Sequence, residues 1–327
     1  MSSKSVAVVG ATGVVGQEML DVLAARDFPL SSIRPLASQR SAGKTVQFRG
    51  EELPVEVLSE DSFSGIDLAF FSAGASISRD YAPAAVDSGA VVVDNSSAFR
   101  MDPGIPLVVP EVNSAAISSH QGIIANPNCS TIIMVVALQP VHELSALTRI
   151  VVSTYQAASG AGAKGMEALR REVSGEELED SPFPHRLAGN LIPRIDVIED
   201  NGYTKEEMKM VLETRKIMGL EGIPVSATCV RVPVERAHSE SIQVTTESSL
   251  ELGAIQDAFE RAPGLQVIDE PVEDRYPTPL EVAGRDDVFV GRLRQHPDED
   301  ATYDFWVVGD QIRKGAALNA VQIAEEL

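Results

Sequence analysis

A glycine-rich turn between a strand and a helix constrains the fold of this chain more than any other stretch. The apolar run Val6–Val9 predicts a buried strand, Gly10, Gly13 and Gly16 follow at three-residue intervals, and apolar residues at helical spacing come next over 17–23. In dinucleotide-binding folds such a turn brings the backbone N–H groups of a helix start against a phosphate. Because the spacing is G-x-x-G-x-x-G rather than G-x-G-x-x-G, a purely structural turn remains an alternative.

The rest of the first part continues the alternation of strands and helices. Short apolar runs bounded by small or polar residues predict buried strands, and one segment between them predicts a helix. The expected strands are 33–37, 66–71, 90–93, 108–113 and 122–125, and the expected helix is 82–88. The pattern is typical of an α/β fold with a Rossmann-like, doubly wound parallel sheet.

The loop after the second strand indicates the cofactor. A carboxylate is expected there when the ribose 2′-hydroxyl of NAD is bound, but 38–44 contains none and offers Ser38, Gln39 and Arg40 instead. Hydroxyl groups and a guanidinium suit a 2′-phosphate, so the sequence favours NADP. Ser72, a small residue at the end of a third strand, leaves room for the same cofactor.

Cys129 is expected at a strand-to-helix turn. It follows the strand 122–125 and precedes an apolar helix that should end near Pro140, and Asn128 is a plausible N-cap. The helix dipole at such a position favours a thiolate, which is a nucleophile. The alternative is a small buried side chain with no chemical role, which is the usual state of a free cysteine.

The pattern changes after about residue 149 to longer alternating strands. We expect an α+β, largely antiparallel second domain. Its strands are predicted at 149–156, 225–234, 241–246, 288–293 and 303–308, and helices at 165–174, 205–218, 252–262 and 316–327. Residues 175–204 are expected to be irregular or to form an interface segment. Thr204 and Glu207 have the spacing of a capping box at the start of 205–218. We place the boundary between domains 1–128 and 129–315.

Several charged side chains fit an anionic substrate. Arg100 follows a strand of the first domain, and Lys216 and Arg231 belong to the second. Glu213 shares a helix face with Lys216, although an exposed ion pair would explain that spacing equally well. His238 is expected in the loop after the strand that carries Arg231. A cysteine, a histidine and a dinucleotide together suit thiolate attack on a carbonyl followed by hydride exchange.

The bulk composition excludes several functions. A net charge of −21, from 48 acidic and 27 basic residues, would repel nucleic acid. The apolar runs are too short to cross a membrane and no signal-peptide pattern opens the chain, so we expect a cytoplasmic protein. The two cysteines cannot form a disulfide framework, and the five scattered histidines predict no metal site.

Taken in order, the motifs resemble the bacterial-type aspartate-semialdehyde dehydrogenases over essentially the whole chain. Each motif is weak alone, but their order and spacing are specific. They are Gly10–Gly16, Asp94–Arg100, Asn126–Thr131, Tyr155–Gly160, Glu213–Lys216, Arg231–His238 and Lys314–Asn319.

The resemblance implies a role for each matching residue. Cys129 would form an acyl thioester, His238 would act as general acid and base, and Gln156 would orient the adduct and contact the substrate. Arg231 would bind the substrate α-carboxylate, Glu213 its ammonium group, and Arg100 and Lys216 the phosphate. The residues expected at NADP are Gly10, Thr12, Gly13, Val14, Val15, Ser38, Gln39, Arg40, Ser72, Ser159, Gly160 and Asn319.

The resemblance also implies the reaction and the assembly. L-aspartyl 4-phosphate would be reduced by NADPH to L-aspartate 4-semialdehyde and phosphate, a step towards lysine, threonine and methionine. The second domain would form a homodimer, and the helix 316–327 would pack back on the first domain. A related phosphorylating enzyme for N-acetylglutamyl phosphate or glyceraldehyde phosphate, and a non-enzymatic nucleotide sensor, remain alternatives.

Overall fold

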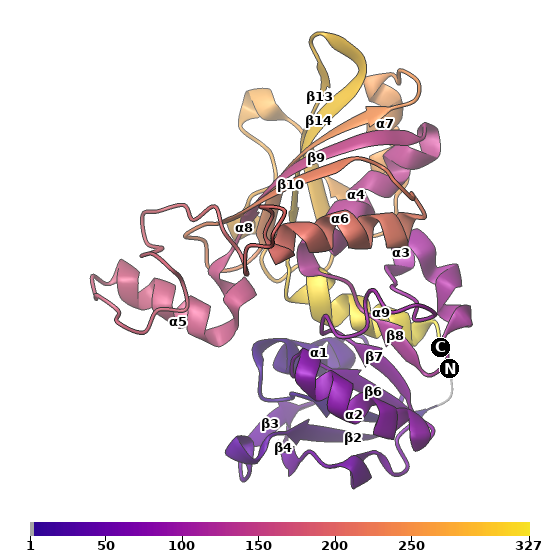
Figure 1. Cartoon of the computed structure of the whole chain (residues 1–327), viewed down its shortest axis with the longest axis vertical. Helices are drawn as coiled ribbons and strands as arrows, with labels where there is room; N and C mark the ends of the chain where they lie inside the picture. The colour runs from indigo at the N-terminus through magenta and orange to yellow at the C-terminus, as the bar shows by residue number, and fades with distance from the viewer. Residues whose placement is uncertain (1–2) are drawn as a thin grey trace. The chain divides into compact units, whose positions relative to one another are not determined.

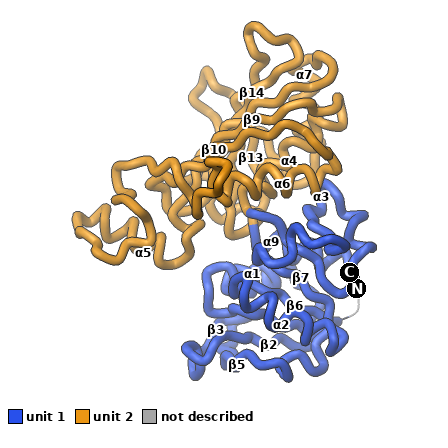
Figure 2. The backbone as a smooth tube through the Cα atoms, viewed as in Figure 1, with its two compact units in different colours: residues 1–128, 316–327 blue, residues 129–315 orange. Residues whose placement is uncertain are grey.

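The computed structural model describes residues 3–327, which form two compact units. Of the described residues, unit 1 contains 3–128 and 316–327, and unit 2 contains 129–315 (Figure 2). The chain therefore leaves unit 1 at Asn128 and returns to it at Ala316.

Unit 1 is built on a six-stranded sheet of order β5-β2-β1-β6-β7-β8, in which all neighbouring pairs are parallel. Parallel strands are covered on both faces, which explains why the central strands of this sheet are largely continuous apolar runs. The strands are β1 (Lys4–Val9), β2 (Leu30–Ala37), β5 (Glu56–Val57), β6 (Leu68–Phe71), β7 (Val91–Asp94) and β8 (Ile123–Ala125).

Two hydrophobic clusters cover the two faces of this sheet. Val6 and Val8 of β1 belong to a cluster that includes α1 (Val14–Ala25) and α9 (Leu318–Glu325). Ala7 and Val9, which point to the opposite face, belong to a cluster with α2 (Ala75–Asp87). The C-terminal helix is thus part of the core of unit 1.

Unit 2 is built on a six-stranded mixed sheet of order β10-β9-β11-β14-β13-β12 (Figure 1). The three central pairs are antiparallel, as expected, whereas both edge strands run parallel to their neighbours. The strands are β9 (Leu147–Gln156), β10 (Val225–Arg231), β11 (His238–Thr246), β12 (Leu265–Val267), β13 (Val288–His296) and β14 (Glu299–Gly309).

The helices of unit 2 are α4 (Cys129–Leu144), α5 (Gly162–Val173), α6 (Lys205–Met218), α7 (Leu252–Arg261) and the short α8 (Pro279–Val282). Figure 1 shows α5 and the segment after it projecting from one side of the sheet. That segment, residues 174–204, contains no helix or strand among its described residues, as the sequence predicts. The predicted capping box of α6 is confirmed, since Thr204 accepts a hydrogen bond from the Glu207 N–H and Glu207 accepts one from the Thr204 N–H.

Both units also contain shorter elements of secondary structure. Unit 1 also contains β3 (Thr45–Phe48), β4 (Glu51–Pro54), α3 (Pro110–Asn113) and the 3-10 helices η1 (Gln39–Ser41), η2 (Glu60–Phe63) and η3 (Ser114–Ser119). Unit 2 contains η4 (Ala158–Ala161) and η5 (Pro271–Glu273), and the π-helical turn η6 (Arg313–Ala317) joins the two. In the described part of the chain, no helix is long and apolar enough to cross a membrane.

Several predicted boundaries are wrong; the helix expected over 82–88, for example, is α2, which begins at Ala75. Residues 108–113 were expected as a strand and turn, but Pro110 occupies the first turn of helix α3, where its fixed φ is compatible with a helix. Helix α4 continues past Pro140 to Leu144, because it is buried from Ser130 to Leu138 and again at Val141, and this packing outweighs one lost hydrogen bond. His238 begins strand β11 rather than lying in a loop.

Candidate active site

Three predicted site residues lie in one row at the strand ends of unit 2. Arg231 of β10 is in register with Gln156 of β9. Ser239 of β11 faces Tyr155, so the preceding residue, His238, comes next to Gln156. Because side chains alternate between the two faces of a sheet, these three residues share one face. Because these residues are expected to act on the substrate, we call Arg231, Gln156 and His238 the catalytic row.

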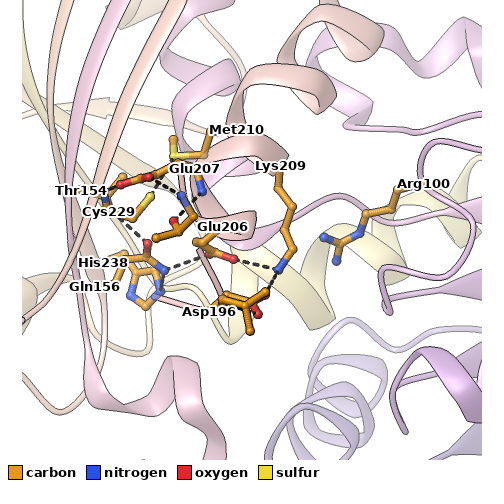
Figure 3. Close-up of polar contacts among 12 residues, drawn as sticks. Arg100, Thr154, Gln156, Asp196, Glu206, Glu207, Lys209, Met210, Cys229 and His238 are labelled. Carbon is orange, nitrogen blue, oxygen red and sulfur yellow. Dashed lines mark hydrogen bonds and ion pairs between the residues drawn. The ribbon is translucent and has the colours of Figure 1, made fainter. Parts of the chain in front are cut away.

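His238 is fully buried and held in one orientation. Its Nδ1 accepts a hydrogen bond from the Ala157 N–H at 3.1 Å, and its Nε2 lies 3.4 Å from Nε2 of Gln156 (Figure 3). Burial, and then the charge of Arg231, lower the pKa of His238 well below its usual value. The ring is therefore neutral, and because Nδ1 accepts, its proton is on Nε2.

Gln311, which the sequence did not indicate as a site residue, holds the start of β11 in place. Ala237 has a positive φ of 73°, and its N–H donates to Oε1 of Gln311 at 2.9 Å. The amide nitrogen of the same glutamine donates to the hydroxyl of Ser159. Gln311 thus ties the loop of Ser159 to the residue before His238.

Arg231 is 7% exposed, and its Nη1 donates to the Ala157 carbonyl at 2.6 Å. Burial lowers its pKa, and the charges of Glu206 and Cys129 oppose that shift. Gly160 lies against both this guanidinium and His238, since a Cβ there would be 2.6 Å from Nη1 of Arg231 and 3.3 Å from Nε2 of His238. Gly160 therefore belongs to the surroundings of the catalytic row.

A chain of polar contacts connects the row to helix α6. Nε2 of Gln156 donates to Oε1 of Glu206 at 3.1 Å, and Oε2 of Glu206 accepts from Nζ of Lys209 at 2.9 Å. Lys209 also donates to Oδ2 of Asp196 at 3.1 Å. Figure 3 shows these side chains converging. Sequence reasoning did not identify Glu206, Lys209 or Asp196 as site residues.

Glu206 and Lys209 were missed because a pattern of charged residues is repeated along α6. A glutamate followed three residues later by a lysine occurs at 206 and 209 and again at 213 and 216. Residues seven apart point in nearly the same direction, so helical periodicity cannot separate the two pairs. Glu213 is 1% exposed and Lys216 half-buried, and both lie two helical turns, about 10 Å, farther along the axis.

Cys129 is the first residue of α4 and is half-buried. A Cβ on Gly315 would come within 3.0 Å of its own Cβ, so the glycine gives the cysteine its space. The other cysteine, Cys229, is fully buried on β10, and burial raises the pKa of its thiol. Of the two, only Cys129 has the accessible helix-start position that favours a nucleophile.

The glycine turn of unit 1 has the close packing that a phosphate cradle requires. Gly10 has a φ of +88°, Gly13 is the N-cap of α1, and a Cβ on Gly16 would lie 2.2 Å from the Gly10 carbonyl. Neither an acidic nor a capping side chain occupies the N-terminal turn of α1, so its N–H groups favour an anion there.

Apart from Asn319, the other residues of unit 1 predicted to bind NADP lie in this turn, at η1 or directly after strand β6. Ser38, Gln39 and Arg40 are exposed at η1. Thr12, between Gly10 and the half-buried Val14 and Val15, has its hydroxyl 3.2 Å from that of Ser41. The hydroxyl of Ser72 donates to the Val9 carbonyl.

Asn319 and Arg100 stabilise the turn that precedes Cys129 from within unit 1. The amide nitrogen of Asn319 donates to Oδ1 of Asn126 at 2.7 Å and to the Val108 carbonyl at 2.9 Å. Nε of Arg100 donates to the Asn126 carbonyl at 2.9 Å, and Nη2 donates to the Asn95 carbonyl at 3.0 Å. Contacts of these two residues with a cofactor or phosphate stay predictions.

Two domain families match the chain. Residues 5–120 match the NAD binding domain of semialdehyde dehydrogenases, and residues 138–314 match their dimerisation domain. Together with the catalytic row and the half-buried helix-start cysteine, these matches define a semialdehyde dehydrogenase.

Relatives that match almost the whole chain show to which semialdehyde dehydrogenases it is related. Proteins named aspartate-semialdehyde dehydrogenase from Aquifex aeolicus and Bacillus subtilis are 53% and 48% identical to this chain, each covering 98% of it and 97% and 96% of their own length. The chain belongs to the aspartate-semialdehyde dehydrogenase family.

Solved structures of aspartate semialdehyde dehydrogenases match this chain as well. Aspartate semialdehyde dehydrogenase II from Vibrio cholerae, complexed with ASA, is 45% identical, with a TM-score of 0.96 over 100% of this chain and 98% of that one. The enzyme from Candida albicans with NADP is 26% identical, with a TM-score of 0.78 over 100% and 98%.

Proposed function

We propose that this chain catalyses the NADPH-dependent reduction of L-aspartyl 4-phosphate to L-aspartate 4-semialdehyde and phosphate. The observation that carries the proposal is the catalytic row, in which a buried arginine, an amide and a neutral histidine lie side by side. Membership of the family, and the semialdehyde complex of the Vibrio cholerae relative, support the same substrate.

Cys129 begins the reaction in this proposal. Its thiolate attacks the acyl carbon of aspartyl phosphate, a C–S bond forms, and the C–O bond to phosphate breaks. NADPH supplies a hydride to the thioester carbonyl when it is bound. Nε2–H of His238 donates a hydrogen bond to the oxygen as negative charge develops there, and that charge passes to the departing thiolate of Cys129 as the C–S bond breaks and the aldehyde forms. Gln156 orients the adduct next to it.

The α-amino acid end of the substrate has two charges that need adjacent partners. Arg231 offers a planar guanidinium for the α-carboxylate. Glu206 is joined to the catalytic row through Gln156, so we assign the ammonium group to Glu206 and the phosphate to Lys209. Arg100 keeps its predicted role as a second phosphate ligand, and Glu213 and Lys216 remain the alternative pair from the sequence.

For NADP, the residues of unit 1 fit the group. The N–H groups of the turn Gly10–Gly16 suit the pyrophosphate, and the exposed Ser38 and Arg40 suit the 2′-phosphate. Ser159 and Gly160 of unit 2 remain expected contacts. The match to a dimerisation domain over 138–314 supports a homodimer formed through unit 2.

The test is an assay in the oxidative direction. Purified protein with NADP should oxidise L-aspartate semialdehyde only when inorganic phosphate is present, because the thioester needs phosphate to leave the enzyme. N-acetylglutamate semialdehyde and glyceraldehyde 3-phosphate should be poor substrates, since they lack the free ammonium group next to a carboxylate. Preferred turnover of either compound, or NADP binding without turnover, would contradict the proposal.

A further inference from the structure

Asp196 belongs to the irregular segment 174–204, which carries no motif that the proposed function uses. Its backbone has a φ of +70°, a left-handed conformation that asparagine and aspartate adopt more readily than other residues with side chains. Oδ1 accepts a hydrogen bond from the Val197 N–H at 2.9 Å. The turn and this bond together direct the other carboxylate oxygen away from its own segment.

That second oxygen, Oδ2, meets the ammonium group of Lys209 at 3.1 Å (Figure 3). Glu206 accepts from the same ammonium at 2.9 Å. Burial lowers the pKa of Lys209, but the two carboxylates outweigh that effect and raise it, so the ammonium stays charged. Two of the three N–H donors of Lys209 are therefore used by carboxylates.

The two carboxylates differ in their access to solvent. The side chain of Glu206 is 7% exposed, whereas that of Asp196 is 34% exposed. Asp196 also lines a hollow of about 500 Å³ whose lining includes Arg231 and Phe183. Asp196 thus contacts Lys209 from a hollow that the substrate-binding arginine also lines.

We propose that Asp196 competes with the phosphate group for Lys209 and so keeps phosphate binding weak, which rests on the proposed role of Lys209 as a phosphate ligand. A phosphate that binds Lys209 must displace the Asp196 carboxylate or approach it closely, and like charges at that separation repel. In the reductive direction phosphate is the product. A carboxylate that returns to Lys209 favours release of that product.

The Asp196→Asn variant tests the proposal, because asparagine has the same shape, tolerates the left-handed backbone and lacks the charge. In the oxidative direction its KM for inorganic phosphate should fall about three- to tenfold, as expected when one partly screened repulsive charge is removed. In the reductive direction, phosphate should inhibit at a correspondingly lower concentration, while the KM for the semialdehyde stays unchanged. Asp196→Gly, which also suits the positive φ, should act in the same direction.

A matched control is Asp200→Asn, which removes the same charge from an exposed position of the same segment and should leave the phosphate KM unchanged. The Lys209→Gln variant tests the phosphate role of Lys209 separately from the competition by Asp196. If Lys209→Gln leaves the phosphate KM unchanged, the proposed phosphate role of Lys209 fails. If it raises that KM but Asp196→Asn leaves it unchanged or raises it, the competition by Asp196 is refuted and the proposed function stands.

Discussion

The amide nitrogen of Gln156 lies 3.1 Å from a carboxylate oxygen of Glu206, so strand β9 and the first turn of α6 meet at the catalytic row. This contact predicts which glutamate binds the substrate ammonium group. Glu206→Gln should raise the KM for aspartate semialdehyde by about 10- to 150-fold, the usual cost of losing one charge-assisted hydrogen bond. Glu213→Gln should change it little. Steady-state kinetics of both variants decide between the two pairs, and the reverse result would restore the assignment to Glu213.

The two cysteines should behave differently. Cys129→Ser should retain only a trace of turnover, because a hydroxyl is a much poorer nucleophile without a strong base. Cys229→Ala should keep most of the activity, although deleting a fully buried side chain should lower the melting temperature. Iodoacetamide should modify Cys129 and leave Cys229 unlabelled in the folded protein. An active Cys129→Ala variant would exclude the thioester route.

Gly160 should not tolerate a side chain. A methyl group there would lie 2.6 Å from Nη1 of Arg231, which is buried and bonded to the Ala157 carbonyl and so cannot easily move away. We expect Gly160→Ala to raise the semialdehyde KM roughly tenfold or more. Gly253→Ala in α7, where a Cβ meets nothing within 4 Å, is the control and should be kinetically normal. Unchanged kinetics of Gly160→Ala would show that Arg231 does not need its present position.

Glu240 should make stability depend on pH. It is fully buried on β11, neither carboxylate oxygen has a hydrogen-bond partner among the described residues, and burial raises its pKa well above the usual value. The folded state therefore keeps the proton while the unfolded state loses it above about pH 4.3, so stability should fall with rising pH by about 1.4 kcal/mol per unit up to the folded pKa. Glu240→Gln should remove this loss.

The measurement is the melting temperature of both proteins between pH 5.5 and 8.5. The difference in favour of Glu240→Gln should grow with pH. Glu247→Gln, at an exposed position just beyond the same strand, should give a constant difference. Parallel curves for Glu240→Gln and the unmodified protein would mean that Glu240 is ionised in the folded state.

Cofactor preference should depend on Arg40. Its exposed guanidinium at η1 suits the 2′-phosphate that distinguishes NADP from NAD. Arg40→Ala should raise the KM for NADP by about tenfold or more and leave that for NAD nearly unchanged. Equal efficiency of the unmodified protein with both cofactors would argue against this role.

Much of the architecture could be predicted because its signals are local. The glycine turn, the continuous apolar strands and the capping box at Thr204 each follow from the backbone needs of one segment. Pro140 shows the limit, because its local preference was outweighed by the burial of the whole helix.

Within the candidate site, the sequence indicated individual residues better than their neighbours. Arg231, Gln156 and His238 lie on three strands, and only the pairing register brings them together. Glu206 could not be separated from Glu213 because their helical directions nearly coincide. Gln311 and Asp196 carry no motif, and their contacts involve residues with a left-handed backbone, Ala237 and Asp196 itself.

The discontinuity of unit 1 has a consequence for biosynthesis. Ala317, Leu318, Ala320 and Val321 complete the cluster that begins at Val6, so the first unit to be translated lacks part of its core until residues 316–327 leave the ribosome. Unit 2 is one uninterrupted stretch and can acquire its structure earlier. A chain released after residue 315 would therefore contain all of unit 2 but an incomplete core of unit 1.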